Sequence, residues 1–177
     1  MGTRGFIVLI CNTKIIVVYN HFDSYPDGLG SIVIRDLNNL LKQYSMDQLK
    51  ELIDKLKIVS DSVPPTESEK ELLSKYANLT VNKRTLDDWY CLLHKCQGSL
   101  IKILESEYAD SPILSIEELD DYIKNSWVNY TYTLNFDTNE FFCNKYYIDK
   151  LDNLQDDWCD SHKWCDSDSD ESNNDEN

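Results

Sequence analysis

Positive charge is scarce in this sequence of 177 residues. Lysine and arginine together number 17 against 32 acidic residues, so the formal net charge is -15. Proteins bind nucleic acids and anionic membranes through clustered Lys and Arg side chains, which neutralise phosphate groups. We therefore expect neither a nucleic-acid partner nor a membrane partner. Nine acids and one lysine lie in residues 156–177, so the C-terminal end contributes most to this imbalance.

Long apolar segments are also absent. The apolar runs at residues 6–11 and 15–19 are separated by polar residues. Neither run approaches the roughly 20 apolar residues that a membrane-spanning helix needs. Both are too short and too broken for the apolar part of a secretion signal. We therefore expect a soluble, intracellular, cytoplasmic protein whose six cysteines are reduced thiols.

None of the sequence motifs that identify a known activity is complete. Gly28-Leu29-Gly30-Ser31 precedes a predicted helix, but it lacks both the lysine of a P-loop and the spacing of a dinucleotide-binding fingerprint. Cys159, His162 and Cys165 are candidate zinc ligands, although they lack the paired cysteines of a zinc ribbon. The sequence therefore identifies no cofactor, and it leaves open whether the protein is an enzyme.

Two apolar, β-branched runs open the chain. Residues 4–10 and 14–20 flank a short polar break, a pattern that predicts a β-hairpin. Nearly every position in these runs is apolar, as in strands that are buried on both faces. Residues 127–135 and 140–143 predict a second hairpin, which residues 146–148 extend.

The middle of the chain has helical periodicity. Apolar residues recur every three or four positions, and capping residues mark several helix starts. The predicted helices cover residues 32–44, 46–59, 67–76, 85–108 and 115–123. We predict an α+β fold, in which the N-terminal and C-terminal hairpins form an antiparallel sheet and the helical middle packs on one face. Residues 1–155 would form this single domain, and the acidic, Ser/Asp-rich residues 156–177 a disordered tail.

The segment that follows the first hairpin, residues 20–30, holds a histidine, two acids, two aromatic residues and two glycines. His21 and Asp23 are two positions apart at a strand end, so their side chains are expected to project to the same side. His21 could act as a general base, with Asp23 either orienting the imidazole or binding a metal ion. The candidate ligand-binding residues around this pair are Thr3, Arg4, Asn20, Tyr25, Asp27, Gly28 and Gly30.

The same segment also fits a purely structural role. Asn20 and Asp23 could cap turns, and His21 could hydrogen-bond to the backbone. Pro26-Asp27-Gly28 has the composition of a turn, because proline restricts φ and glycine accepts a positive φ. The residue types alone therefore leave a site and an ordinary loop as alternatives.

Two blocks of this sequence resemble an uncharacterised family that is scattered through phages, large DNA viruses and fungi. Met1-Gly2-Thr3-Arg4-Gly5 and Tyr19-Asn20-His21-Phe22-Asp23-Ser24-Tyr25-Pro26-Asp27-Gly28-Leu29-Gly30 are similar to the family's opening, "MGTRG" followed by "YNHxDSYPxGLG". The resemblance implies a shared fold and a shared site. It supplies no established activity, and for a viral protein it implies location in the host cytoplasm.

The end of the predicted domain resembles the same family. Tyr132-Thr133-Leu134-Asn135-Phe136-Asp137 and the later Leu151-Asp152-Asn153-Leu154 are similar to its C-terminal strand, "DLD" turn and "LDN" sequence. Asn135 and Phe136 depart from the family pattern at the turn. The two blocks together cover less than a third of the chain.

Two functional hypotheses follow. In the first, the protein is a binding module that recognises a protein or small-molecule partner through the loop from His21 to Gly30. In the second, it is a small hydrolase-like enzyme with a His/Asp site, in which metal assistance is an option. We favour the first hypothesis, because no nucleophile, phosphate loop or complete metal-ligand set can be named from the sequence.

Overall fold

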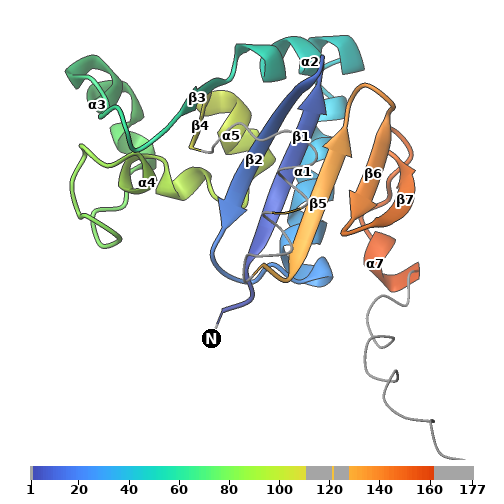
Figure 1. Cartoon of the computed structure of the whole chain (residues 1–177). Helices are drawn as coiled ribbons and strands as arrows, with labels where there is room; N and C mark the ends of the chain where they lie inside the picture. Colours follow the sequence, from blue (N-terminus) through green and yellow to red (C-terminus); the bar gives the residue numbers. More distant parts are fainter. Residues whose placement is uncertain (1, 111–120, 122–127, 162–177) are drawn as a thin grey trace, which may run out of the picture.

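The computed structural model describes residues 2–110, 121 and 128–161 (Figure 1). The strands are β1 (Gly5–Cys11), β2 (Lys14–Asn20), β3 (Lys57–Val59), β4 (Tyr108–Asp110), β5 (Tyr130–Asn135), β6 (Glu140–Cys143) and β7 (Tyr146–Lys150). The helices are α1 (Ser31–Leu41), α2 (Met46–Lys55), α3 (Glu67–Leu73), α4 (Trp89–Leu92), α5 (Leu100–Ser106) and α7 (Trp158–Ser161). Single turns of other helix types are η1 (Pro26–Gly30), η2 (Ser74–Tyr76) and η3 (His94–Cys96). The predicted helix at residues 115–123 falls almost entirely outside the described residues.

The main sheet has five strands in the order β2-β1-β5-β6-β7. The predicted α+β architecture, with a sheet built from both ends of the chain, is confirmed. Both hairpins are antiparallel, but β5 pairs with β1 in parallel, from Gly5 opposite Tyr130 to Ile10 opposite Asn135. The sheet is therefore mixed and not antiparallel throughout. A parallel neighbour requires a long crossover. The helical middle of the chain supplies this crossover. Its sequence does not show at which end of the sheet the chain returns, so the direction of β5 relative to β1 could not be predicted.

Alternate residues of β1 and β2 point to opposite faces of the sheet, and both faces are buried. Ile7 and Leu9 belong to the large core that includes Leu37 of α1, whereas Phe6 and Val8 belong to a second apolar cluster. Helix α1 lies behind the sheet in Figure 1 and covers the first of these faces. Burial on both faces explains why almost every residue of the two strands is apolar.

A π-helical turn, η1, leads directly into helix α1. The helical backbone begins before Ser31, so this residue is the first of α1, whereas the sequence predicts a helix that begins one residue later, at residue 32. Its hydroxyl donates a hydrogen bond to the carbonyl oxygen of Pro26, at 3.1 Å. Ser31 therefore joins the loop to the helix.

The predicted long helix at residues 85–108 is wrong. It is divided into α4, η3 and α5, and its last residue begins strand β4, which pairs in parallel with β3. Helix α4 ends at Leu92, and the interruption between η3 and α5 includes Gly98, whose φ of 74° is left-handed. A Cβ atom there would lie 2.9 Å from the side-chain oxygen of Asn20. The close approach of these two segments requires glycine and ends the helix.

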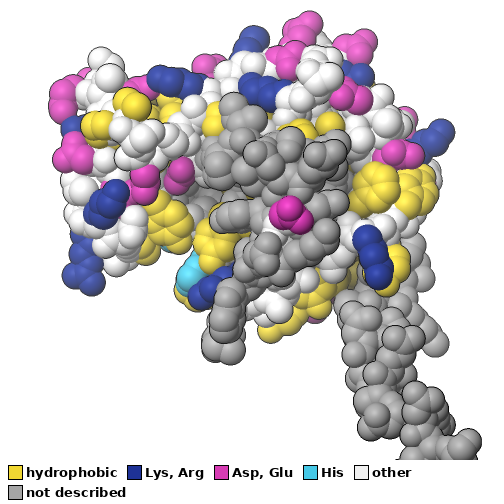
Figure 2. Space-filling model, viewed as in Figure 1, with side chains coloured by type: hydrophobic (Ala, Val, Ile, Leu, Met, Phe, Trp, Pro, Cys, Tyr) yellow, Lys and Arg dark blue, Asp and Glu magenta, His cyan; other side chains and the backbone are white. Residues whose placement is uncertain are grey.

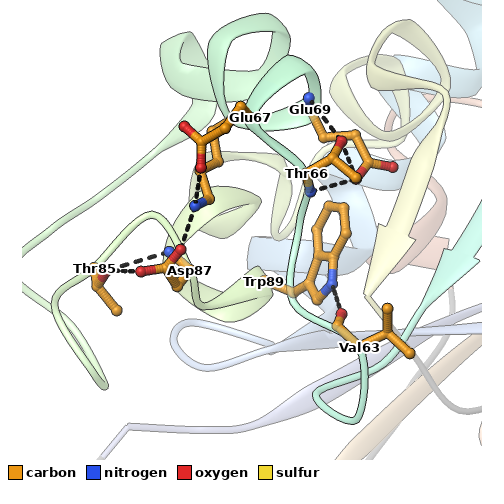
Figure 3. Close-up of polar contacts among 8 residues, drawn as sticks. Val63, Thr66, Glu67, Glu69, Thr85, Asp87 and Trp89 are labelled. Carbon is orange, nitrogen blue, oxygen red and sulfur yellow. Dashed lines mark hydrogen bonds and ion pairs between the residues drawn. The ribbon is translucent and has the colours of Figure 1, made fainter.

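Residues 60–98, here called the side lobe, lie beside the edge strand β2 (Figure 1). The predicted capping box is confirmed, because Thr66 and Glu69 exchange side-chain and backbone hydrogen bonds at the start of α3. Figure 3 shows these contacts together with the hydrogen bond from the Trp89 indole to the carbonyl oxygen of Val63, at 2.8 Å. Lys70 of α3 forms ion pairs with Glu67 of the same helix and with Asp87, which lies just before α4. These contacts fix the α3 and α4 segments relative to each other.

The ordered core extends beyond the predicted domain end at residue 155. Trp158 in α7 is only 3% exposed and contacts the rings of Tyr132 and Phe141 edge to face, with centroids 6.3 and 5.6 Å away. The assignment of residues 156–177 to a disordered tail is therefore wrong for its first residues. The segment was predicted to be disordered because it is acidic, but Trp158 is a large apolar side chain that packs in the core.

Candidate functional site

The loop of residues 21–30 is fixed to the N-terminal segment and to the sheet. Ser24 is completely buried, and its backbone N–H donates to the carbonyl oxygen of Thr3 at 3.2 Å. The hydroxyl of Tyr132 in β5 donates to the carbonyl oxygen of Ser24 at 2.9 Å. The side-chain amide of Asn20 donates to the Ser24 hydroxyl at 2.9 Å and to the backbone oxygen of Phe22. Asn20 and Thr3 thus hold the shape of the loop.

The loop glycines permit close packing. Gly30 is buried, and a Cβ atom added to it would lie 2.6 Å from Trp158 and 2.8 Å from Tyr132. An added Cβ at Gly28 would collide with the backbone oxygen of Asp23. The structure therefore places both predicted ligand-binding glycines against the protein itself. Their close contacts account for the residue type without a ligand.

His21 has a phenol as its partner and not a carboxylate. Its Nδ1 lies 2.8 Å from the hydroxyl of Tyr19, and its ring packs edge to face against Phe22, with centroids 4.3 Å apart. Asp23 is exposed, has a left-handed φ of 51°, and accepts a hydrogen bond through its backbone oxygen from Leu29. His21 lines a surface cavity that Asp23 does not line. The predicted His/Asp pair thus does not meet in this cavity.

This cavity, here called the outer cavity, has a volume of about 540 Å³ and lies between the loop and the side lobe. His21 and Phe22 come from the loop, five residues from the side lobe, including His94 of η3, and Asp110 from the end of β4. The complete lining is His21, Phe22, Asp61, Val81, Asn82, Tyr90, His94 and Asp110. The tertiary structure therefore brings together two of the three histidines of the chain.

Burial changes the protonation of two residues that line the outer cavity. Burial, reinforced by the neighbouring Asp61 and Asp88 carboxylates, raises the pKa of Asp110 to about 6. Burial, together with the nearby His21, lowers the pKa of His94 below its ordinary value. The Nδ1 atom of His94 is buried and has no hydrogen-bond partner. The cavity thus contains a neutral imidazole beside a carboxyl group that titrates near physiological pH.

A second, smaller cavity adjoins the outer one. This inner cavity has a volume of about 90 Å³, and it shares Tyr90 and Asp110 with the outer cavity. Most of its lining is apolar and comes from β2, β4, α5 and the segment around η3, with the side chains of Val18, Leu93, Cys96, Ile103 and Ala109. One carboxylate and one phenol therefore belong to the lining of both the polar outer cavity and the mostly apolar inner cavity.

The other predicted site residues do not line either cavity. Arg4 exchanges backbone hydrogen bonds with Asn129, donating to its side chain and accepting from its N–H. Tyr25 is 47% exposed, and its ring lies 6.2 Å from that of Tyr130. Asp27 is exposed on η1. These residues belong to a surface around the loop that is separate from the cavity lining.

The candidate zinc ligands fall at the edge of the described residues. The sulfur of Cys159 lies 3.6 Å from the hydroxyl of Ser31. His162 and Cys165 lie outside the described residues, so the three-ligand prediction stays a prediction. Among the residues that the structure describes, no three His, Cys, Asp or Glu side chains are grouped so that they could hold a metal ion.

Of the eight residues that line the outer cavity, sequence reasoning named only His21 as a site residue. His94 falls within the predicted helix at residues 85–108, and the charged residues Asp61 and Asp110 have no motif around them. The scarcity of histidine was the available signal, because only three occur in the chain. Pairing His94 with His21 required knowledge of how the side lobe folds back onto β2.

Comparisons with protein families, curated proteins and solved structures found no match. The resemblance to the viral, phage and fungal family therefore stays a prediction. Within the described ranges, none of the helices has the length and apolar character needed to cross a membrane.

Proposed function

We propose that this protein is a binding module that holds a small ligand in the outer cavity. The observation that supports this proposal is the convergence of His21 and Phe22 from the loop with His94, Tyr90 and Asp110 on one concave surface. A volume of about 540 Å³ falls within the range of roughly 300–1,000 Å³ that is usual for small-molecule sites. The loop of residues 21–30 then contributes one wall of the site, as the first functional hypothesis requires.

The side chains that line the outer cavity favour binding over covalent chemistry. None of its described lining residues is Ser, Thr, Cys or Lys, four of the side-chain types that act as nucleophiles in covalent catalysis. The lining instead combines aromatic faces with a few polar atoms that converge on the same space. That combination is typical of sites that orient a ligand by hydrogen bonds and bury its apolar part.

A thermal-shift screen with matched variants tests this proposal. The full chain would be screened against amino acids, amines, sugars, sugar phosphates, nucleotides and divalent metals. A ligand present at 100 times its Kd stabilises the folded state by about 2.7 kcal/mol, which raises the melting temperature by several degrees. We expect this shift in the wild type and in Asp23→Ala, but not in His21→Ala or His94→Ala. A shift that survives both histidine substitutions would place the ligand elsewhere and refute the proposal.

A second candidate function is that of a small hydrolase-like enzyme. The specific observation in its favour is that Asp110 and His94 share one cavity, with the pKa of the carboxyl raised and that of the imidazole lowered. Groups whose pKa values are displaced by their surroundings are common acid and base catalysts. In this candidate, His21 is the general base for water and Asp110 the general acid.

Hydrolysis of p-nitrophenyl acetate and p-nitrophenyl phosphate tests this second candidate. An enzyme should show saturable hydrolysis that falls at least 100-fold in His21→Gln, because general acid–base catalysis contributes about 10²–10⁴-fold. Equal rates for the wild type, His21→Gln and Asp110→Asn would reject hydrolysis of these two ester classes by this site.

We also propose an intracellular location. The five cysteines among the described residues, at positions 11, 91, 96, 143 and 159, are free thiols, and four of them are buried. Cysteines of secreted proteins are commonly paired in disulfides. Thiol titration of the protein purified without reductant tests this, and rapid disulfide formation in air would argue against it.

A further inference from the structure

The outer and inner cavities share two lining residues, Tyr90 and Asp110. A ligand that occupied both spaces would therefore lie against this pair. The Asp110 carboxyl is already partly removed from water, since burial is the main cause of its raised pKa. A cationic partner would offset the cost of ionising this carboxyl group in its buried position. This position is therefore suited to a positively charged group.

The outer cavity adds to this preference. It is lined by two carboxylates, Asp61 and Asp110, and by the aromatic rings of Phe22 and Tyr90. No Lys or Arg is among its described lining residues, although Lys83 reaches Asp61 from outside, with 3.6 Å between Nζ and Oδ2. Carboxylates and aromatic faces both attract organic cations, whereas a phosphate or carboxylate ligand would be repelled here.

The wider surface is consistent with a cationic ligand. In Figure 2, acidic side chains gather along the upper edge of the molecule, over α2 and α3, with Lys and Arg interspersed. The chain carries a net charge of -15. A negative field of this kind raises the local concentration of cations and repels anions. Charge alone does not define the ligand, but it acts in the same direction as the cavity lining.

The inner cavity limits the apolar part of the ligand. Its volume of about 90 Å³ exceeds the roughly 10–15 Å³ that one water molecule needs. It is smaller than the cavity of about 150 Å³ that holds benzene in a well-studied protein. A short aliphatic chain of about three to five carbons fits this space, and its mostly apolar walls would replace water around such a chain.

We infer that the ligand of this site is an organic ammonium ion with a short aliphatic tail, its nitrogen on Asp110 and its tail in the inner cavity. This inference rests on the proposed binding function and names the chemical class of the ligand. The ammonium group would face Asp61, Asp110 and the ring of Tyr90, and the tail would contact Leu93, Ile103 and Ala109.

Isothermal titration at pH 7.5 with three compounds of similar shape tests the charge. The probes are 3-methylbutylamine, 3-methyl-1-butanol and 3-methylbutanoate. We expect the ammonium compound to bind at least tenfold more tightly than the alcohol, and the carboxylate to show no binding. Asp110→Asn should remove this preference for the ammonium ion, whereas the control Asp149→Asn, on the far strand β7, should retain it.

A series of straight-chain amines tests the inner cavity. Each added methylene that enters it should raise affinity roughly fourfold, which corresponds to about 0.8 kcal/mol per buried CH₂. We expect this gain from ethylamine to about pentylamine and none beyond. Ala109→Val reduces the volume of the inner cavity and keeps a residue that favours strands, so the gain in affinity should end at a shorter amine.

The outcomes separate this inference from the proposed function. If the alcohol or the carboxylate binds as tightly as the ammonium ion, and His21→Ala abolishes that binding, the site exists but the inferred ligand class is wrong. If none of the three compounds binds, the ammonium inference is refuted, and the broader screen decides the proposed function by itself. A gain in affinity that Ala109→Val leaves unchanged would refute the placement of the tail.

Discussion

Ending the chain after Asp157 should destabilise the protein strongly, although the acidic composition of residues 156–177 predicts a dispensable tail. This truncation removes Trp158, which is 3% exposed and packs edge to face on Tyr132 and Phe141. Truncation of a buried Trp side chain to Ala costs about 3–5 kcal/mol, through lost apolar burial and the cavity left behind. The cavity would lie against Gly30, where the indole of Trp158 leaves no room for a side chain.

The cost can be measured by urea unfolding, followed by far-UV circular dichroism. For a protein of this size, a loss of 3–5 kcal/mol lowers the melting temperature by roughly 6–20 °C. A chain that ends after Cys165 provides the control, because residues 166–177 contain no apolar side chain and so have nothing to bury. Trp158→Ala in the full chain should reproduce most of the effect of the shorter truncation.

Equal stability of the chains that end after Asp157 and after Cys165 would refute this reasoning. It would mean that the contacts of Trp158 contribute no net stability. A second informative result would be that the two truncated chains differ in their free energy of unfolding while Trp158→Ala leaves it unchanged. The stabilising contacts of the C-terminal end would then come from other residues between 159 and 165.

Three further predictions concern other parts of the structure. Gly30→Ala should lower the free energy of unfolding by about 1–3 kcal/mol, because its Cβ would lie 2.6 Å from Trp158. Urea titration of this variant beside the wild type measures the loss, and an unchanged unfolding midpoint would contradict the packing argument. Hydrogen bonds from Lys57, then from Thr66, lower the pKa of Glu69 to about 2, so the stabilisation by its carboxylate is complete above pH 4.5 and declines toward pH 2. Glu69→Gln should make the free energy of unfolding less dependent on pH in this window, and an unchanged pH profile would contradict this prediction. Burial raises the pKa of Asp110 to about 6, so its contribution to stability is lost as pH rises from 3.8 through 6. The melting temperature of Asp110→Asn, relative to that of the wild type, should therefore be higher at pH 8 than at pH 4. A difference between the two proteins that is the same at both pH values would be the contrary result.

Local patterns in the sequence were sufficient to predict most of the individual elements. The two β-branched runs, the C-terminal hairpin and the capping box at Thr66 depend on periodicity and on hydrogen bonds between near neighbours. The predictions that were wrong concern segments whose structure depends on contacts between residues far apart in the chain. Gly98 breaks a helix because its backbone lies against Asn20, and that contact has no local signature.

The candidate site divides in the same way. His21 was predicted because it stands at a strand end, in a segment crowded with polar and aromatic residues. Its predicted partner, Asp23, was chosen by spacing, but the structure gives His21 a hydrogen bond to Tyr19 and places it in a cavity with His94 and Asp110. Spacing along the chain can rank neighbours on one strand, but it carries no information on segments that meet only after folding.

The sequence by itself determined the α+β class and the burial of the first hairpin on both faces, because these depend on composition and short-range periodicity. Only the tertiary structure decided that β5 runs parallel to β1, that Trp158 completes the core, and that the loop and the side lobe enclose a cavity. Those features depend on the direction in which a long crossover returns and on packing between residues far apart in the chain.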